Sequence, residues 1–175
     1  SNKDPNGNFD GLGLFPEQIE GYGLGVMHAR ARYYAAKDPT LASYLDEGRA
    51  YGPHGQGLII ANSVANYNDE KSKRLTELAL TANIKAREYG FKPYVAPALS
   101  SGALSLLATL RGEWHYSSTY LGGIFMGARN RRCSAGLEIE ALPLSQQLKQ
   151  RIEETTEILK SLNNSIIGLS SDTGR

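Results

Sequence analysis

His54 and Arg30 are the two residues whose types best suit a chemical task. His54 stands in the glycine-rich segment YGPHGQG, residues 51–57, and Arg30 stands in HARARY, residues 28–33. A glycine-flanked imidazole can exchange a proton with a substrate oxygen, and a planar guanidinium can bind a carboxylate through two parallel hydrogen bonds. Together they predict chemistry on a small hydroxy or keto acid. The alternative is a histidine in a turn and an arginine on the surface, because their spacing is not a motif by itself.

The elements that must position these two residues follow from the spacing of apolar residues. The sequence predicts a helix over 26–37, which Pro39 closes. Residues 44–52 are predicted as a short strand that runs into the His54 turn, and residues 58–64 as a second strand just beyond it.

The rest of the chain is predicted to contain two longer helices, three strands and a last helix. In order, these are helices over 70–89 and 99–111 with an extended segment at 94–97 between them, strands over 113–121, 123–133 and 137–142, and a helix after the N-cap residue Ser145. Residues 1–14 are expected to be an irregular leading segment and residues 163–175 a frayed tail. Helices that alternate with antiparallel strands predict one α+β domain over residues 1–175, with its sheet packed against long helices.

Composition argues against several classes of partner. The 175 residues are 41% hydrophobic and 21% charged with a formal net charge of +1, so nothing indicates a nucleic-acid or anionic membrane surface. No apolar run approaches the length of a membrane span. The single cysteine, Cys133, excludes an internal disulfide and favours a reducing, cytoplasmic location. His28, His54 and His115 have no metal-ligand spacing with this cysteine, so we predict no metal site.

Several short motifs, taken in chain order, resemble the C-terminal substrate-binding domain of the lactate/malate dehydrogenase family. FP at 15–16 and GYGLGVMHARAR at 21–32 resemble the family's Phe-Pro, Gly-x-Gly and Leu-Asp-x-Ala-Arg-x-Arg segment, and GPHGQ at 52–56 resembles its Gly-x-His-Gly-Asp turn. YVAPA at 94–98 resembles the Tyr-Tyr-Ala-Pro-Ala stretch of the lactate-dehydrogenase-like malate dehydrogenases. SSTY at 117–120 and GLEIEALPLS at 136–145 resemble later strands of the family. The resemblance covers about residues 12–162.

This resemblance implies a role for each matching residue. Arg30 would hold the carboxylate of a 2-hydroxy or 2-keto acid, and His54 would be the catalytic acid and base. Tyr94 and Ala98 would line the far side of the substrate pocket, which tilts the prediction toward malate. The cofactor would be NAD, bound mainly by an N-terminal Rossmann domain. The complete protein would be a homodimer or a homotetramer.

Two positions depart from the family's pattern. Met27 stands where the family has the aspartate that hydrogen-bonds the catalytic imidazole, and a thioether is at best a weak acceptor. By analogy with the serine-protease triad, loss of an orienting carboxylate costs on the order of 10⁴ in rate. Gln56 replaces the aspartate of the histidine turn. A substitute partner for the imidazole would have to come from Glu20, Asp46, Glu47 or His28.

The dinucleotide-binding half of such an enzyme is missing from this sequence. GYGLG at 21–25 is glycine-rich, but no βαβ unit surrounds it, so the cofactor-binding residues stay unknown. We therefore expect a C-terminal domain of an NAD-dependent malate or lactate dehydrogenase that does not turn over as this chain alone. The alternative is a non-catalytic relative that serves as a binding or assembly module, which Met27 favours. A glycosidase relative is a minor third option, because such enzymes use manganese and a cysteine–histidine site that this chain lacks.

Overall fold

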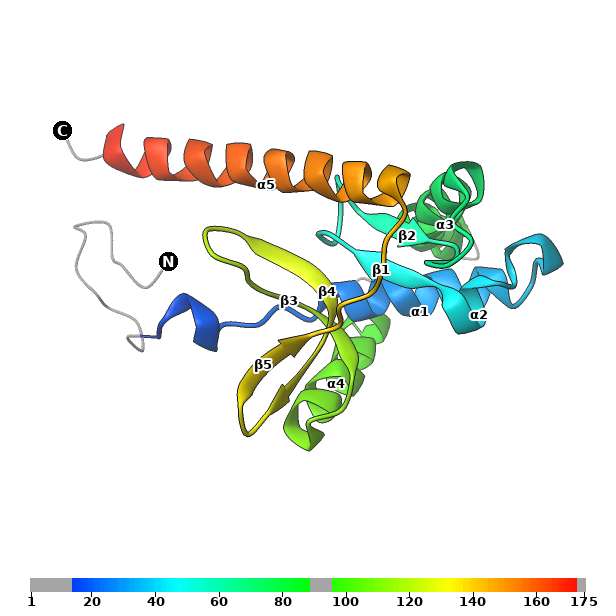
Figure 1. The fold of residues 1–175 in the computed structure, drawn as a ribbon, viewed down its shortest axis with the longest axis horizontal. Helices are drawn as coiled ribbons and strands as arrows, with labels where there is room; N and C mark the ends of the chain where they lie inside the picture. Colours follow the sequence, from blue (N-terminus) through cyan, green and yellow to red (C-terminus); the bar gives the residue numbers. More distant parts are fainter. Residues whose placement is uncertain (1–13, 89–95, 173–175) are drawn as a thin grey trace.

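The structure, a computed structural model, describes residues 14–88 and 96–172, except for the side chains of residues 96–101 and 166–172. Figure 1 shows how the helices and strands are arranged. In chain order they are η1 (Pro16–Gln18), α1 (Gly23–Ala35), η2 (Pro39–Leu41), α2 (Tyr44–Glu47), β1 (Arg49–Tyr51), β2 (Ile59–Ala61), α3 (Asp69–Glu88), α4 (Ala96–Arg111), β3 (His115–Tyr120), β4 (Phe125–Cys133), β5 (Gly136–Ile139) and α5 (Gln146–Asp172).

Helix α1 packs against α3, α4 and β3 and contributes one whole face to the core. Leu24, Met27, Ala31 and Ala35 recur at intervals of three and four residues, so this face is apolar, and all four are buried. The core closes around them with Leu41, Tyr44, Ala50, Leu58, Ile60, Leu75, Ala79 and Tyr116. Full burial of one aliphatic side chain stabilises by about 1.5–3 kcal/mol, so this face fixes the orientation of α1 and hence the position of Arg30.

Two antiparallel sheets lie beside α1. Strands β1 and β2 form a hairpin in which Ala50 is opposite Ile60, and β4 is the middle strand of the sheet β3-β4-β5. The backbone N–H of Gly52, which follows β1, donates to the carbonyl oxygen of Gly127 in β4 at 2.9 Å. This bond joins the two sheets at the point where the His54 turn begins.

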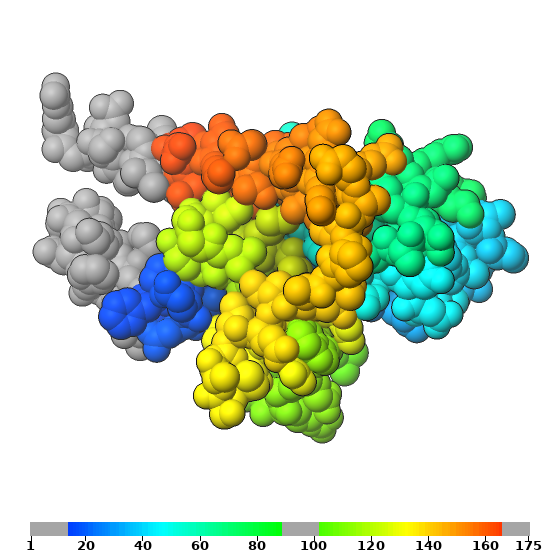
Figure 2. Space-filling model, viewed as in Figure 1, coloured from blue at the N-terminus to red at the C-terminus, as the bar shows by residue number. Residues whose placement is uncertain are grey.

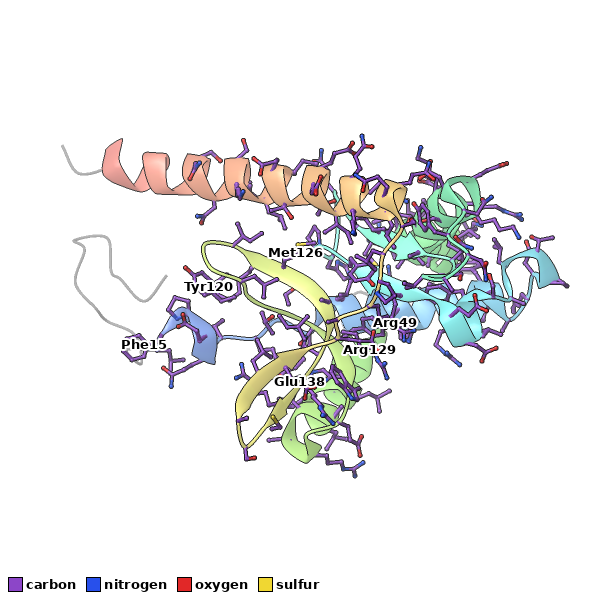
Figure 3. The ribbon with its side chains drawn as sticks, viewed as in Figure 1. Phe15, Arg49, Tyr120, Met126, Arg129 and Glu138 are labelled. Atoms are coloured by element: carbon purple, nitrogen blue, oxygen red, sulfur yellow. The ribbon has the colours of Figure 1, made fainter. Side chains whose placement is uncertain are left out.

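Helix α5 contacts both sheets. It runs along the top of the view in Figure 1, and in Figure 2 its orange-to-red atoms lie against the yellow-green atoms of the β3–β4 hairpin. Leu148 is fully buried against Ile59 and Ala61 of β2. Further along, the Thr156 hydroxyl donates to the sulfur of Met126, which Figure 3 labels on β4 (3.6 Å). The long last helix therefore covers the strands on both sides of the histidine turn.

Most of the predicted elements are confirmed. The fold is α+β, with antiparallel strands packed against long helices, and the helices predicted over 70–89 and 99–111 correspond to α3 and α4. The predicted cap of the last helix is also present, because the backbone N–H of Leu148 donates to the Ser145 hydroxyl at 3.3 Å. Within the described residues, no helix is long and apolar enough to cross a membrane.

Three local predictions are wrong. Residues 44–47 form a helix and not a strand, because Tyr44 turns into the core, where its ring lies so close to Gly48 that a Cβ there would be 2.0 Å away. The extended segment predicted at 94–97 is helical from Ala96 onward. The tail predicted to fray from residue 163 continues the hydrogen bonding of α5 to Asp172. Residues 1–13 of the predicted irregular segment lie outside the described residues.

Candidate active site

His54 lies at the rim of a cavity beside the first turns of α1. The cavity has a volume of about 570 Å³ and is open to solvent along one side; its lining residues are Tyr22, Gly23, Val26, His54, Gly102, Ala103 and Leu106. Clefts of this size, with mostly apolar walls and few polar groups, are typical of small-molecule sites. Among the described lining residues only His54 and Tyr22 have polar side chains, so a ligand in the cavity would meet the imidazole.

The turn that carries His54 is held at both ends by glycines. Gly52 and Gly57 have φ values of +88° and +90°, a conformation that side chains rarely adopt. At the first end, Gly52 is bonded to Gly127 as described above. At the second, the Thr155 hydroxyl of α5 donates to the Gly57 carbonyl at 2.9 Å. The turn is therefore fixed by β4 and by α5, which are both distant in sequence.

Gly23, in the first turn of α1, lies directly against His54. A Cβ at this position would lie 2.9 Å from the Cβ of His54 and 3.3 Å from two atoms of its ring. Any larger residue at 23 would therefore displace the imidazole, and glycine gives the ring its present place on the cavity wall.

The imidazole of His54 is poised to stay neutral at neutral pH. Partial burial lowers its pKa below the ordinary 6.5, and the positive charge of Arg30 lowers it further, against an opposing hydrogen bond to its own backbone. No hydrogen bond joins the two side chains in the described structure, but they are near enough for the charge of one to act on the other. A neutral imidazole can accept a proton from a hydroxyl group.

Arg30 lies on the same side of α1 as the cavity wall. It follows Gly23 and Val26 at helical spacing, seven and four residues on, so it projects one turn beyond them. Its guanidinium donates to the Ala79 carbonyl of α3 at 3.2 Å, and burial lowers its pKa. Among the described residues it has no carboxylate partner. A half-buried cation that lacks an anion is a candidate anion-binding group.

Met27 occupies the position next to this guanidinium. It is 2% exposed, in the main core cluster, and its sulfur accepts from Arg30 at 3.7 Å. The described structure places no carboxylate against His54 either. Of the alternatives, Asp46 is exposed on α2 and Glu47 accepts a hydrogen bond from Ser63. The imidazole therefore stands without an orienting acid.

Solved structures of malate dehydrogenases share this architecture. The chain superimposes on the malate dehydrogenase from Aeropyrum pernix with a TM-score of 0.64 at 20% identity, over 87% of this chain and 57% of that one. It superimposes on the malate dehydrogenase from Archaeoglobus fulgidus, solved in complex with NADH, with a TM-score of 0.60 at 18% identity, over 87% of this chain and 54% of that one. The chain has a malate-dehydrogenase-like fold.

This fold is the one that the motif resemblance implied. The chain spans a little more than half the length of those two enzymes. No protein-family model matches the sequence. No curated protein matches it either. At these identities the likeness is one of fold.

Two residues that the resemblance placed in the substrate pocket are not described. Tyr94 lies outside the described residues, and Ala98 lies within α4 at a position where only the backbone is described. Among the described residues of α4, Gly102, Ala103 and Leu106 line the cavity beside His54. Their small and aliphatic side chains gave no chemical signal in the sequence.

The other two histidines are occupied in the core. His28 shares a hydrogen bond with the Tyr44 hydroxyl at 2.8 Å and stacks on Tyr116 with 4.2 Å between ring centroids. Burial is the main reason that its pKa falls to about 4, and nearby arginines lower it further. The predicted alternative, in which His28 supports the imidazole of His54, does not fit these contacts.

Sequence reasoning missed a buried ion pair between Glu20 and His115. Their side chains are 6% and 5% exposed and lie 2.9 Å apart, and Arg132 donates to the other carboxylate oxygen at 3.2 Å. Burial alone would raise the pKa of Glu20, but hydrogen bonds led by the one from His115 bring it down to about 2. Gly21 then pairs with Ser118 through two backbone hydrogen bonds. This anchoring fixes the segment that carries the cavity wall.

A second cluster joins the two sheets. Glu140 accepts from Arg49 at 2.5 Å and from Arg129, and Figure 3 shows these two arginines near each other where the sheets meet. The single carboxylate of Glu140 is thus shared by one arginine from each sheet. The cluster is therefore structural and lies apart from the cavity lining.

The described residues do not fit a dinucleotide site. All paired strands are antiparallel in residues 14–88 and 96–172, so the βαβ unit that seats a pyrophosphate is not formed there. Residues 21–25 start a helix that packs on the cavity, with no strand leading into it. Within the same residues, no three acidic, histidine or cysteine side chains are arranged to bind a metal.

Proposed function

We propose that this chain is the substrate-binding domain of an NAD-dependent 2-hydroxyacid dehydrogenase of the malate/lactate type. In this proposal residues 1–175 are one domain of a longer protein, and a Rossmann domain elsewhere in it binds NAD. The complete protein would be a cytoplasmic homodimer or homotetramer. As this chain alone, it would bind the acid but would not turn it over.

One observation carries the proposal. His54 stands on the wall of a cavity formed by α1, and Arg30 on the same side of α1 has no carboxylate partner in the described chain while its charge lowers the pKa of His54. A cation close to a neutral base suits a 2-hydroxy acid, because its carboxylate needs a counter-charge and its hydroxyl needs a proton acceptor. The malate-dehydrogenase-like fold supports the same assignment.

The two side chains would divide the work as follows. Arg30 would bind the carboxylate through the N–H groups that Ala79 and Met27 leave available, and so orient the substrate. His54, neutral at pH 7, would take the proton of the 2-hydroxyl as the acid is oxidised and return it in the reverse direction. The apolar residues beside His54 would shield one side of the imidazole from water and so strengthen its interaction with the substrate.

The test is NADH oxidation by the full-length protein with a series of 2-oxo acids. General acid–base catalysis contributes about 10²–10⁴ in rate, so His54→Gln should lower kcat by that factor without unfolding the protein. Gln56→Ala, in the same turn and exposed, is the matched control and should change kcat less than threefold. If the full-length protein binds NADH but reduces none of the 2-oxo acids, the proposal is rejected.

The second candidate is a non-catalytic binding module of the same fold. Met27 favours it, because a buried thioether replaces the acid that would orient His54. A module would bind 2-hydroxy acids through Arg30 with the same affinity in wild type and His54→Gln, and neither would consume NADH.

A further inference from the structure

We infer that the cavity beside His54 receives the side chain of the acid, and that this side chain is apolar and branched or aromatic rather than a second carboxylate as in malate. The inference rests on the proposed function for the places of the carboxylate and the hydroxyl. It adds the substrate class, which the fold alone leaves open.

The walls of the cavity decide the polarity of the ligand. Val26 of α1 and Ala103 and Leu106 of α4 contribute only hydrocarbon, and among the described lining residues only His54 and Tyr22 have a polar side chain. Leu106 is 45% exposed, although leucine is usually buried. An apolar group that fills the cavity would remove this surface from water, whereas a carboxylate there would lose its hydration and gain no partner.

The charges around the cavity do not supply a second anion site. Arg30 is committed to the carboxylate next to the reacting carbon in the proposed function. None of the described lining residues is an arginine or a lysine, and arginines of β1 and β4 pair with carboxylates: Arg49 and Arg129 with Glu140, and Arg132 with Glu20. In the described chain, then, a dicarboxylic acid would have one carboxylate without a counter-charge.

The size of the cavity agrees with a side chain of several carbons. Its volume of about 570 Å³ lies within the range of small-ligand sites and exceeds what a methyl group would fill. Each methylene group that is fully buried strengthens binding roughly fourfold. We therefore expect 2-hydroxy-4-methylpentanoate to bind at least tenfold more tightly than lactate, and malate to bind no more tightly than lactate.

The experiment is an NMR titration of this chain with lactate, 2-hydroxy-4-methylpentanoate and malate. Binding is followed through the imidazole signal of His54, which is assigned by its absence from the spectrum of His54→Gln. Leu106→Lys places a cation on the cavity wall at a position exposed enough to accept it. It should weaken binding of 2-hydroxy-4-methylpentanoate at least tenfold and strengthen binding of malate. Leu110→Lys is the matched control, because Leu110 lies on the same helix, is 76% exposed and is not a lining residue. It should leave all three affinities within twofold.

Several results would overturn the inference. Malate binding as tightly as 2-hydroxy-4-methylpentanoate would do so, as would equal effects of the two lysine substitutions, or a His54 signal that none of the three acids shifts. Failure of the proposed function has a different signature in the full-length protein. Turnover that is fastest with oxaloacetate would reject only the apolar side chain, whereas absence of turnover with every 2-oxo acid would reject the dehydrogenase.

Discussion

The guanidinium of Arg30 donates to the sulfur of Met27, three residues earlier on the same helix, at 3.7 Å. Met27, at the position where the motif resemblance leads us to expect an orienting acid, is thus in contact with the arginine that we propose binds the carboxylate. Whatever side chain stands at position 27 acts first on Arg30, and on His54 through the charge of Arg30.

Substituting Met27→Asp tests this relationship. The new carboxylate should pair with Arg30 and cancel its charge, so the pKa of His54 should rise. Because the position is 2% exposed, loss of the methionine and burial of an acid should lower the free energy of unfolding by about 2–4 kcal/mol. Met27→Leu, which adds no charge, should cost less than about 1.5 kcal/mol and leave the pKa unchanged. Turnover of the full-length protein should gain less than about tenfold; a gain of several orders of magnitude would mean that the acid reaches His54 directly.

Removing the cation should also raise the pKa of the His54 imidazole, and it should weaken binding of the acid. A nearby positive charge disfavours protonation, so Arg30→Gln should raise the pKa of His54, as measured by NMR titration. Affinity for 2-hydroxy acids should fall by about 10²-fold, because charge-assisted hydrogen bonds contribute about 1.5–3 kcal/mol each. Arg32→Gln is the control, since Arg32 bonds to the Leu45 carbonyl. An equal loss of affinity in both variants would contradict the carboxylate-binding role.

Gly23→Ala should disable the site while sparing the fold. The added methyl group would lie 2.9 Å from the Cβ of His54, so the imidazole has to move. We expect kcat of the full-length protein to fall at least tenfold, since a displacement of 1 Å can cost about 10² in rate. Alanine is favoured over glycine in helices, so the melting temperature should hold or rise. Gly102→Ala, on the opposite wall with 4.0 Å of room to the nearest atom, should change kcat little. Equal activity of both variants would show that the place of the ring does not matter.

Because His28 is buried as a neutral imidazole, we expect the free energy of unfolding to fall in mild acid. Its pKa falls from the ordinary 6.5 to about 4 on folding, so between these values the unfolded chain binds more protons than the folded one. Stability should therefore decrease as the pH falls from 6.5 to 4, by about 3 kcal/mol in total. His28→Asn, which can still bond to Tyr44, should remove this slope from urea unfolding measured across that range. A slope that persists in the variant would assign the effect to other groups.

Protonation of Glu20 should lower the free energy of unfolding further in stronger acid. Its pKa is lowered from 4.5 to about 2 in the folded protein, so the stabilisation is present above pH 4.5 and disappears as the pH falls toward 2. The expected contribution is on the order of 3 kcal/mol, because the carboxylate is almost fully buried against His115 and Arg132. Glu20→Gln should flatten the unfolding profile below pH 4.5. Glu138→Gln, whose exposed carboxylate pairs with Arg131 on the sheet surface, should not.

Periodicity predicted the elements that carry strong local signals. The apolar spacing of α3 and α4, the strands β3 to β5 and the hydroxyl cap at Ser145 are local properties, and the structure confirms them. Residues 44–47 were predicted wrongly because a buried tyrosine overrides local strand propensity there. Burial by residues that are distant in sequence cannot be predicted from about ten neighbouring residues.

The candidate site also combines features that local sequence predicts with features that depend on packing. The presence of a histidine and an arginine of the right types was visible in the sequence, and their mutual influence follows only from how α1 packs. The ion pair of Glu20 with His115 joins residues 95 positions apart, and no spacing rule connects them. The apolar wall of α4 was invisible for another reason: leucine and alanine in a helix indicate a core, whereas here Leu106 faces a cavity.

The bond from the Thr155 hydroxyl to the Gly57 carbonyl has a consequence for how the protein is made. During synthesis, the loop that presents the imidazole leaves the ribosome long before the helix that closes behind it. A nascent or prematurely terminated polypeptide that stops short of Thr155 will have most of the hydrophobic interior but a loose histidine loop. The His54 loop is therefore held in its present place only once the helix that carries Thr155 has packed behind it.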